Sequence, residues 1–367
     1  MGSDGVGDER MRIVRYHPRA AVGDGGMTGA IRRWSESVAS LGADVSVAFE
    51  KGSEPPEGNG VRWIPVRHGG SGRTRMPLRL EDALRGADLL VLHSAWSLHN
   101  VRAAAVARKL KVPYLLEPRG AYDPHIVARK RRVKQAWWLA AERKLVDGAR
   151  AIHVFFEPER SHLKAIGYRG PVVVAPNGPP LPGRSWDGGT GGYILWLGRF
   201  DPQHKGLDLL VRGLDELPPD QRPHLRIQGP DWRGRKQQVV SMVEDLGLGE
   251  WVTIGDPVYG EGKTNLLAMS TGFVYPSRWD ACPNALLEAA AMGIPTVATP
   301  YPLGVYLASR GGAFLADATV DGVAGALQKL GSDRADEVGR IGAKVVGDEL
   351  PWEAVARSWL QQVEAVL

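Results

Sequence analysis

Short apolar segments alternate with amphipathic segments along the first half of the chain. The apolar segments at 11–16, 44–49, 88–93, 113–118, 149–155 and 171–178 have the length of buried strands. The segments 27–43 and 100–111 repeat apolar residues every three or four positions, as a helix with one buried face does. Strands that alternate with helices predict a parallel sheet covered on both faces by right-handed crossovers.

A segment rich in Pro and Gly interrupts this alternation. Residues 177–192 read NGPPLPGRSWDGGTGG and show no periodicity. The alternation then resumes at 193–200 and continues to an amphipathic helix at 351–367. We therefore expect an α/β protein with two doubly wound, Rossmann-like domains facing a central cleft, over 11–178 and 193–350. Residues 179–192 are the expected linker, and the helix 351–367 is expected to cross back to the first domain.

Composition adds the expected compartment and a possible binding surface. The 367 residues contain a single cysteine, Cys282, which is typical of a reducing compartment. A charged leader and an apolar run of about 18 residues, the length that spans a bilayer, are both lacking, so a cytoplasmic protein is expected. The net charge of +5 is concentrated at Ala128–Leu145, which holds seven basic residues and one acidic residue.

The same segment contains Trp137 and Trp138, and two interpretations stay open. Cations beside tryptophans on a helix are typical of contact with an anionic membrane surface, at its cytoplasmic face. Alternatively, the helix is solvated and the two tryptophans belong to the core. Nucleic acid is not an expected partner, because no stacking platform or known nucleic-acid motif accompanies the charge.

Candidate chemistry lies in the loops that follow strands, where parallel sheets bind ligands. Arg199 follows the strand at 194–197, and Lys205 comes six residues later. A planar guanidinium and a compact ammonium on one loop suit a diphosphate, although two solvated surface cations are the plainer alternative.

A second loop, 277–284, leads into a helix and carries Asp280, with Glu288 eight positions further on. Pro283 is placed in the first helical turn, so the amides of Asn284 and Ala285 are expected to face an anion. Glu288 would accept hydrogen bonds from ribose hydroxyls, and Asp280 from the hydroxyls of a sugar. These two loops together predict a nucleotide-diphospho-sugar site, whereas an ordinary capped helix with exposed acids would leave Asp280 unexplained.

These motifs resemble the retaining glycosyltransferases of family 4, which have the GT-B fold. The resemblance rests on an acid and a Glu separated by seven residues (Asp280 and Glu288), on the following AMGIPTVAT, and on Gly198-Arg199 with Lys205-Gly206. It also extends over GDGGMTGAIRRW, LLVLHSAWS, VPYLLEPRGAYDP, RAIHVFFEPERSHLKAIG and VVVAPNGPPL, in the order seen in a branch of polysaccharide and antibiotic pathways.

The resemblance implies a transferase that needs neither a metal nor a cofactor. A UDP-, GDP- or dTDP-sugar would give its sugar, with retention and front-face substitution, to a hydroxyl acceptor; a lipid-linked acceptor is one option. Asp280, Arg199 and Lys205 are the expected catalytic residues. The expected donor-binding residues are Glu288, Asn284, Ala285, Cys282, Gly25, Gly26 and Gly229.

Three departures from the family pattern bear on the site. The first acid is usually Glu and is Asp280 here, and the spacing from Arg199 to Lys205 is one residue longer than the commonest form. Many members carry a His where this chain reads EPRGAYDP, so Arg119 and Asp123 become candidates for acceptor or sugar contacts. His93, at the end of its strand, is a third candidate.

Two other functions are compatible with the same fold. A phosphorylase or sugar-nucleotide epimerase would share these motifs, and a protein that binds a nucleotide-sugar without catalysis would fit the change at Asp280. A dinucleotide-binding dehydrogenase is disfavoured, because the third glycine position of the G-x-G-x-x-G pattern that starts at Gly23 is Thr28.

Overall fold

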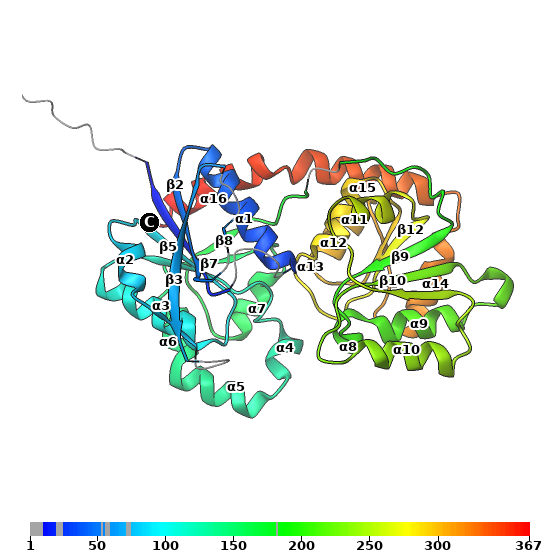
Figure 1. Cartoon of the computed structure of the whole chain (residues 1–367), viewed down its shortest axis with the longest axis horizontal. Coiled ribbons are helices and arrows are strands. Elements are labelled where there is room, and N and C mark those ends of the chain that lie inside the picture. Colours follow the sequence, from blue (N-terminus) through cyan, green and yellow to red (C-terminus); the bar gives the residue numbers. More distant parts are fainter. Residues whose placement is uncertain (1–9, 20–24, 53, 56–58, 71–74, 181–182) are drawn as a thin grey trace, which may run out of the picture. The chain divides into compact units, whose positions relative to one another are not determined.

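The computed structural model describes residues 10–19, 25–52, 54–55, 59–70, 75–180 and 183–367. The chain divides into two compact units. The first comprises Met1–Asn177 with Trp352–Leu367, and the second comprises Gly178–Pro351. Both are α/β structures built on parallel sheets (Figure 1).

The first unit has an eight-stranded sheet in the order β4-β3-β2-β1-β5-β6-β7-β8. All pairs are parallel except β3 with β4. The strands are β1 (Arg12–His17), β2 (Asp44–Glu50), β3 (Val61–Gly69), β4 (Met76–Leu78), β5 (Leu89–His93), β6 (Tyr114–Glu117), β7 (Ala151–Val154) and β8 (Val172–Val174). The helical elements are α1 (Gly25–Ser40), α2 (Leu80–Leu84), α3 (Leu98–Lys109), α4 (Pro124–Ala128), α5 (Arg131–Trp137), the π-helix η2 (Trp138–Glu142), α6 (Arg143–Asp147), α7 (Glu159–Ala165) and α16 (Trp352–Glu364).

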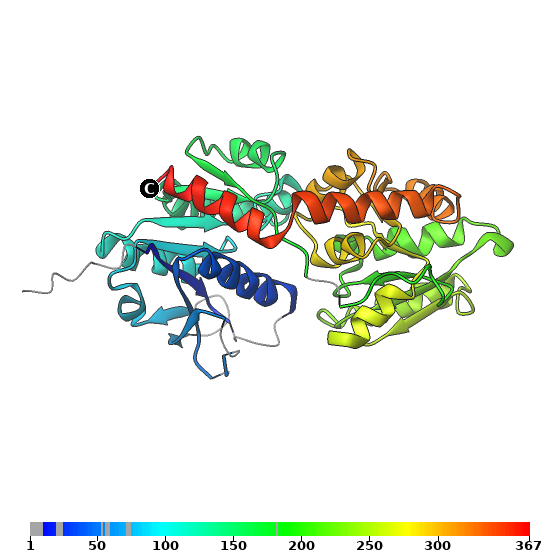
Figure 2. The same cartoon turned by 90° about the horizontal axis from the view of Figure 1, so that it is seen from above.

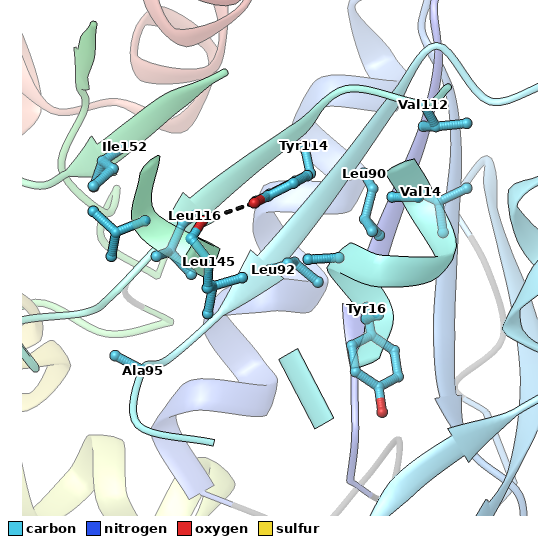
Figure 3. Packing of buried hydrophobic residues seen from close by; sticks show 14 of the residues in the cluster. Val14, Tyr16, Leu90, Leu92, Ala95, Val112, Tyr114, Leu116, Leu145 and Ile152 are labelled. Carbon is cyan, nitrogen blue, oxygen red and sulfur yellow. Dashed lines mark hydrogen bonds between the residues drawn. The ribbon is translucent and has the colours of Figure 1, made fainter. Parts of the chain in front are cut away.

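The core of the first unit lies on both faces of this sheet. Leu90, Leu92 and Leu116 share one apolar cluster with Tyr114, whose hydroxyl donates a 2.7 Å hydrogen bond to the carbonyl oxygen of Leu145 (Figure 3). The central strands are buried throughout, as expected for parallel strands covered on both faces.

The helix α16 completes the other face of the first unit. Val355, Trp359 and Val363 repeat every four residues and share a core cluster with Trp34 of α1. Helices α1 and α16 therefore pack side by side (Figures 1 and 2). The Trp34 indole nitrogen also donates a 2.9 Å hydrogen bond to Asn177 Oδ1.

The second unit has a six-stranded parallel sheet in the order β11-β10-β9-β12-β13-β14. The strands are β9 (Tyr193–Leu197), β10 (His224–Gln228), β11 (Val252–Gly255), β12 (Gly272–Tyr275), β13 (Thr296–Ala298) and β14 (Phe314–Leu315). The helical elements are α8 (Pro202–Lys205), α9 (Leu207–Asp215), the short η3 (Pro219–Gln221), α10 (Lys236–Asp245), α11 (Gly260–Ala268), α12 (Asn284–Ala291), α13 (Pro302–Ala308), α14 (Val320–Lys329) and α15 (Ala335–Glu349). The described part of the chain has no helix of the length and apolar character that spanning a bilayer requires.

The second half of the Pro/Gly-rich segment is fixed to the second unit. The Trp186 indole nitrogen donates to the Ser270 carbonyl oxygen at 2.7 Å, and the Gly191 amide donates to that of Met269 at 2.8 Å. Asp187 caps the turn by accepting from the amides of Gly189 and Thr190. Of the linker expected at 179–192, the residues from Trp186 onward are therefore packed and hydrogen-bonded, and residues 181–182 lie outside the described part.

Candidate functional site

The central candidate residues gather where the strand order of the second unit changes direction. The chain leaves β9 toward β10 and β11 on one side and returns on the other side with β12, which pairs directly with β9. In doubly wound sheets, ligands bind beyond the carboxyl ends of the strands at this switch point. Arg199 follows β9 and Asp280 follows β12, so the topology brings the two predicted loops together.

Lys205 and Asp280 form a nearly buried ion pair at this position. Lys205 Nζ lies 2.5 Å from Asp280 Oδ2, and the two side chains are 10% and 19% exposed. Burial lowers the pKa of Lys205, but the charge of Asp280, its hydrogen bond and the Tyr275 hydroxyl together outweigh this, and the net shift is upward. Burial likewise raises the pKa of Asp280, and the charge and hydrogen bond of Lys205, with smaller contributions from neighbouring groups, turn this into a net decrease. Both groups are therefore charged at neutral pH.

The ring of Tyr275 lies beside the ion pair of Lys205 and Asp280. Lys205 Nζ lies 5.2 Å from the ring centroid of Tyr275, whose hydroxyl is 3.4 Å from Asp280 Oδ2. The second oxygen of Asp280, Oδ1, accepts a 3.0 Å hydrogen bond from the Ala281 amide. The carboxylate is thus held by its own loop and by Lys205.

Arg199 is oriented by His204. The Arg199 guanidinium donates to His204 Nδ1 at 3.1 Å, and His204 Nε2 donates to the Trp279 carbonyl oxygen at 2.8 Å. The His204 and Trp279 rings stack with centroids 4.9 Å apart. This arrangement requires a neutral imidazole with hydrogen on Nε2, which agrees with the burial that lowers the pKa of His204.

Two further residues hold the Arg199 loop. Asp201 accepts a 2.5 Å hydrogen bond from Arg235. The Arg199 guanidinium also contacts an aromatic ring: its carbon lies 4.9 Å from the ring centroid of Trp232. Arg199 and Lys205 also interact electrostatically, since the charge of Arg199 lowers the pKa of Lys205.

Glu288 lies on α12, with 10% of its side chain exposed, and its carboxylate pairs with Lys263 of α11. The helix begins one residue later than expected: Pro283 is the N-cap, and Asn284 is the first helical residue. Asn284 and Ala285 are half-buried, and their amides are at the helix end whose N–H groups have no acceptor within the helix. Cys282, just before the helix, is buried.

Gly229 has a steric explanation. A Cβ atom at this position would lie 1.6 Å from the Gly198 carbonyl oxygen, so only glycine allows the loops after β10 and β9 to touch. Gly206, which follows Lys205 in the sequence, likewise allows a close approach to the loop after β12. Its φ is +68°, and a Cβ atom would lie 1.8 Å from the Pro276 carbonyl oxygen. Both glycines set the spacing of the loops that carry the charged residues.

The candidates of the first unit lie in different settings. Gly25 and Gly26 form the first turn of α1 rather than a loop, and residues 20–24 before them are outside the described part. His93, a candidate for sugar or acceptor contact, is 1% exposed, and its Nδ1 lies 3.2 Å from Glu117 Oε2, which agrees with the alternative of a buried polar residue that has a partner. Burial lowers the pKa of His93 to about 4. A direct substrate contact by His93 is therefore not supported.

Arg119 and Asp123 lie on the loop after β6. Arg119 keeps 12% of its side chain exposed and contacts Glu117 at 2.5 Å. Asp123 is the N-cap of α4, where its Oδ1 accepts from the His125 amide at 2.8 Å. The carboxylate of Asp123 therefore has a structural partner, whereas Arg119 retains exposed donor capacity.

The two tryptophans of the basic segment contact side chains in the interior of the first unit. The indole nitrogen of Trp137 donates to Glu142 Oε2 at 2.8 Å, and Trp138 packs against the core and Trp96. Glu142 is fully buried and also accepts from the Tyr122 hydroxyl and the Trp96 amide. The exposed apolar side chains of the segment are instead Val133, at 59%, and Leu139, at 77%.

Sequence reasoning missed several residues that position the charged groups. They are His204, Tyr275, Trp232, Lys263 and Glu117. His204 was adjacent to Lys205 and offered a signal, whereas Tyr275 and Glu117 were hidden inside apolar strands. In the described residues, His, Cys, Asp and Glu side chains form no group of three or more that is placed to hold a metal ion.

Comparison with known families matches both units. The model of the "glycosyl transferase 4-like domain" matches residues 25–178, and that of "glycosyl transferases group 1" matches residues 191–333. The curated relatives include mannosylfructose-phosphate synthase of Agrobacterium fabrum, 32% identical over 119 residues that cover 30% of this chain and 26% of the relative. O-antigen chain mannosyltransferase B of Escherichia coli is 26% identical over 164 residues, covering 44% of this chain and 43% of the relative. The matches thus span less than half the length of either relative.

Solved structures agree on the fold over nearly the whole chain. Sucrose-phosphate synthase from Thermosynechococcus elongatus superposes with a TM-score of 0.78 at 18% identity, covering 97% of this chain and 99% of that one. Anabaena HepE in complex with UDP and glucose gives 0.77 at 14% identity, covering 97% and 100%. Because both family models match and the solved structures share its architecture, the chain belongs to the family 4-like glycosyltransferases of the GT-B fold.

Proposed function

We propose that this glycosyltransferase moves a sugar from a nucleotide-diphospho-sugar to a hydroxyl acceptor, with retention at the anomeric carbon and without a metal or cofactor. The observation that carries the proposal is the placement of Arg199 and Lys205, with Asp280, at the switch point of the second unit. Two preorganised cations there can neutralise a leaving diphosphate. Retention and front-face substitution follow from the family resemblance.

Each charged residue has a distinct role in this proposal. Arg199, held by His204, and Lys205 bind the diphosphate, assisted by the amides of Asn284 and Ala285. Lys205 has three N–H donors and can therefore keep Asp280 while it binds a phosphoryl oxygen. Asp280 accepts hydrogen bonds from the transferred sugar, and Glu288 accepts from the ribose. Gly229 and Cys282 shape the same donor site through the backbone, and Gly25 and Gly26 let the first unit approach the substrates.

Catalysis in this proposal is mainly positioning and charge stabilisation. As the bond to the anomeric carbon breaks, negative charge grows on the diphosphate beside Arg199 and Lys205. A phosphoryl oxygen of the leaving group then takes the proton of the attacking hydroxyl on the same face. Because both cations are fixed before the reaction, little reorganisation is needed at that moment.

The donor would be a UDP-, GDP- or dTDP-sugar. Structures of HepE, which shares the fold, contain UDP and UDP-glucose. The relatives from Agrobacterium and Escherichia coli are named for mannose-containing products or mannosyl transfer. UDP-glucose and GDP-mannose are therefore the first donors to test, with dTDP-glucose as the third.

The test separates transfer from the two alternatives. The purified chain is incubated with each donor, with and without a mixture of sugar and lipid-linked acceptors, in EDTA. Release of nucleoside diphosphate that depends on acceptor, with an α-linked product from an α-linked donor, supports the proposal. Interconversion of the donor sugar without acceptor would indicate an epimerase, and donor binding without any conversion would indicate a non-catalytic protein.

We also propose that the chain works in the cytoplasm, at the inner face of a membrane, on a lipid-linked acceptor. The specific observation is the surface of Ala128–Leu145, where Val133 and Leu139 are exposed among the cations. The two tryptophans face inward, so the contact would use these aliphatic side chains and the basic residues Arg129, Lys130, Arg131, Arg132, Arg143 and Lys144.

A further inference from the structure

A cluster of charged side chains is buried at the carboxyl ends of the central strands of the first unit. Glu117, the last residue of β6, lies at its centre. Arg119 Nη2 lies 2.5 Å from one of its oxygens, and His93, His153 and Arg15 lie 3.2, 3.4 and 3.8 Å from the other. These partners come from β5, β7, β1 and the loop after β6, and this is the edge where such sheets bind ligands.

The cluster carries more positive than negative charge. Burial alone would raise the pKa of Glu117, but Arg119 and the two histidines bring it well below its usual value, so the group is a carboxylate. Burial lowers the pKa of Arg15 to about 10, which leaves it charged at neutral pH. Two guanidinium groups therefore face one carboxylate, and His93, whose pKa burial lowers to about 4, is neutral.

Arg119 is the member of the cluster that reaches solvent. Its side chain is 12% exposed, whereas those of Arg15, Glu117, His93 and His153 are at most 1% exposed. The guanidinium carbon lies 5.6 Å from the ring centroid of Phe155, so one face of the group is covered. Its Nε has no hydrogen-bond acceptor within the described part of the molecule.

The backbone of Arg119 is also unusual. Its φ is +52°, in the left-handed region that a long side chain enters at a cost of about 1 kcal/mol. A buried excess of positive charge, unused donors and a strained backbone are each unfavourable for a structural arginine. Together they are the features of a cation that is fixed in place to receive an anion.

We propose that Arg119, positioned by Glu117, binds an oxyanion, a phosphate or a carboxylate, carried by the acceptor. This rests on the proposed function, in which Arg199 and Lys205 of the second unit hold the donor diphosphate and the first unit receives the acceptor. Glu117 holds Nη2 and Nε is buried, so Nη1 is the nitrogen that can reach an oxyanion of either kind, and the planar guanidinium keeps it in a fixed position. The acceptor is thus an acidic sugar or sugar phosphate, free or lipid-linked, rather than a neutral sugar.

The test measures the binding of matched sugars to the full chain. Glucose, glucose 6-phosphate and glucuronate are titrated calorimetrically into protein that is saturated with UDP, which occupies the donor phosphate site. We expect at least one of the two acidic sugars to bind about 10-fold or more tightly than glucose. Arg119→Gln should remove this preference, and Lys109→Gln, which removes an exposed cation at the end of α3, should leave it intact.

Several outcomes would overturn the inference. Equal binding of the three sugars by the unsubstituted chain would do so, as would a preference that survives in Arg119→Gln. If Arg119→Gln does not fold, Arg119→Lys takes its place. Lysine keeps the positive charge but lacks the planar guanidinium, so the preference for acidic sugars should fall by several-fold. An undiminished preference in Arg119→Lys would then count against the assignment.

The same titrations keep the two proposals apart. If UDP, GDP and dTDP all fail to bind, the proposed donor site itself is contradicted, and if GDP or dTDP binds in place of UDP, the sugars are titrated in its presence. UDP that binds normally, followed by no discrimination among the sugars, would contradict only the role of Arg119. If instead UDP-glucuronate binds more tightly than UDP-glucose and Arg119→Gln removes that difference, the oxyanion belongs to the transferred sugar and the acceptor assignment is wrong.

Discussion

Lys205 Nζ lies 2.5 Å from Asp280 Oδ2, although the two residues are 75 positions apart in the sequence. Both side chains are largely withdrawn from water, so each charge depends on the other. The pair joins the loop after β9 to the loop after β12 and fixes a cation where a diphosphate would bind.

This pair predicts that stability and activity can be separated. Asp280→Ala leaves a nearly buried ammonium without its partner and should destabilise the second unit by about 3 kcal/mol. Lys205→Met combined with Asp280→Ala removes both charges and should recover most of the lost melting temperature. The double variant should nevertheless lose about 100-fold or more in kcat/KM, because the diphosphate has lost a cation. Thermal unfolding and donor turnover measure the two effects, and near-normal turnover would contradict the assignment of Lys205.

His204 is predicted to act through Arg199. His204→Ala removes both the acceptor of the guanidinium and the donor to Trp279, and we expect kcat/KM to fall by about 10-fold. His204→Gln can accept with its carbonyl oxygen and donate with its amide nitrogen, so it should recover part of the activity. The informative comparison is made in the Arg199→Ala background, where either His204 substitution should have little further effect. Equal losses with and without Arg199 would mean that His204 acts independently.

Gly229 offers a prediction about loop spacing. Gly229→Ala places a methyl group against the Gly198 carbonyl oxygen, so the loops after β9 and β10 must separate. We expect a loss of about 2 kcal/mol or more in stability, together with weaker donor binding. Gly249→Ala is the matched control, because a Cβ atom there meets no atom within 4 Å. Similar melting temperatures for both variants would show that the close contact at Gly229 is unimportant.

The buried histidines predict lower stability in mild acid. Burial lowers the pKa of His93 and of His99 to about 4, from an ordinary value of about 6.5. Between these values the unfolded chain binds more protons than the folded chain, so stability falls as the pH decreases from 6.5 to 4. Each histidine can contribute up to about 3 kcal/mol.

Melting temperatures measured across this pH range check the prediction. His99→Gln should make the decline shallower, whereas His224→Gln, which changes an exposed histidine, should reproduce the slope of the unsubstituted chain. A slope that His99→Gln does not alter would show that His99 is not one of the groups responsible.

The proposed membrane contact predicts which side chains of the basic segment bind vesicles. Because the two tryptophans face inward, the exposed Leu139 and the basic residues should be responsible. Leu139→Asp should reduce co-sedimentation with vesicles of phosphatidylglycerol and phosphatidylcholine by several-fold, and exchanging Arg131 and Arg132 for Gln should do the same at low salt. The fold should be unaffected, because Leu139 is 77% exposed. Leu315→Asp, at another exposed leucine, is the control. The absence of vesicle binding by the unsubstituted chain at low salt would rule the contact out.

Hydrophobic periodicity predicted the two parallel sheets because most of their strands are short and completely buried. It missed β3 and β4 at the edge of the first sheet. β3 contains the exposed Arg62 and Arg67 among apolar residues, and Pro65 lies within the strand. An edge position tolerates both features, since it exposes side chains and needs fewer backbone donors. The helices α13 to α15 were also not predicted.

The candidate site was predictable as residue types on loops, but its contacts were not. Lys205 and Asp280 meet because β12 inserts beside β9, and no local pattern indicates that strand order. The place of His93 at a strand end made it a candidate for substrate contact, but the sequence did not indicate that the buried carboxylate of Glu117 lies beside it. The π-helix at Trp138–Glu142, which turns Glu142 inward, has no recognisable signal in the sequence.

The packing of α16 against α1 has a consequence for the order of events during synthesis. Trp359, which lies against Trp34 and over the Arg15 guanidinium, is synthesised only after the whole of the second unit. Until then the nascent first unit lacks part of its interior, and a buried arginine has no aromatic cover from that helix. The second unit, continuous in sequence, can fold first, and α16, which is translated after it, then completes the core of the first unit.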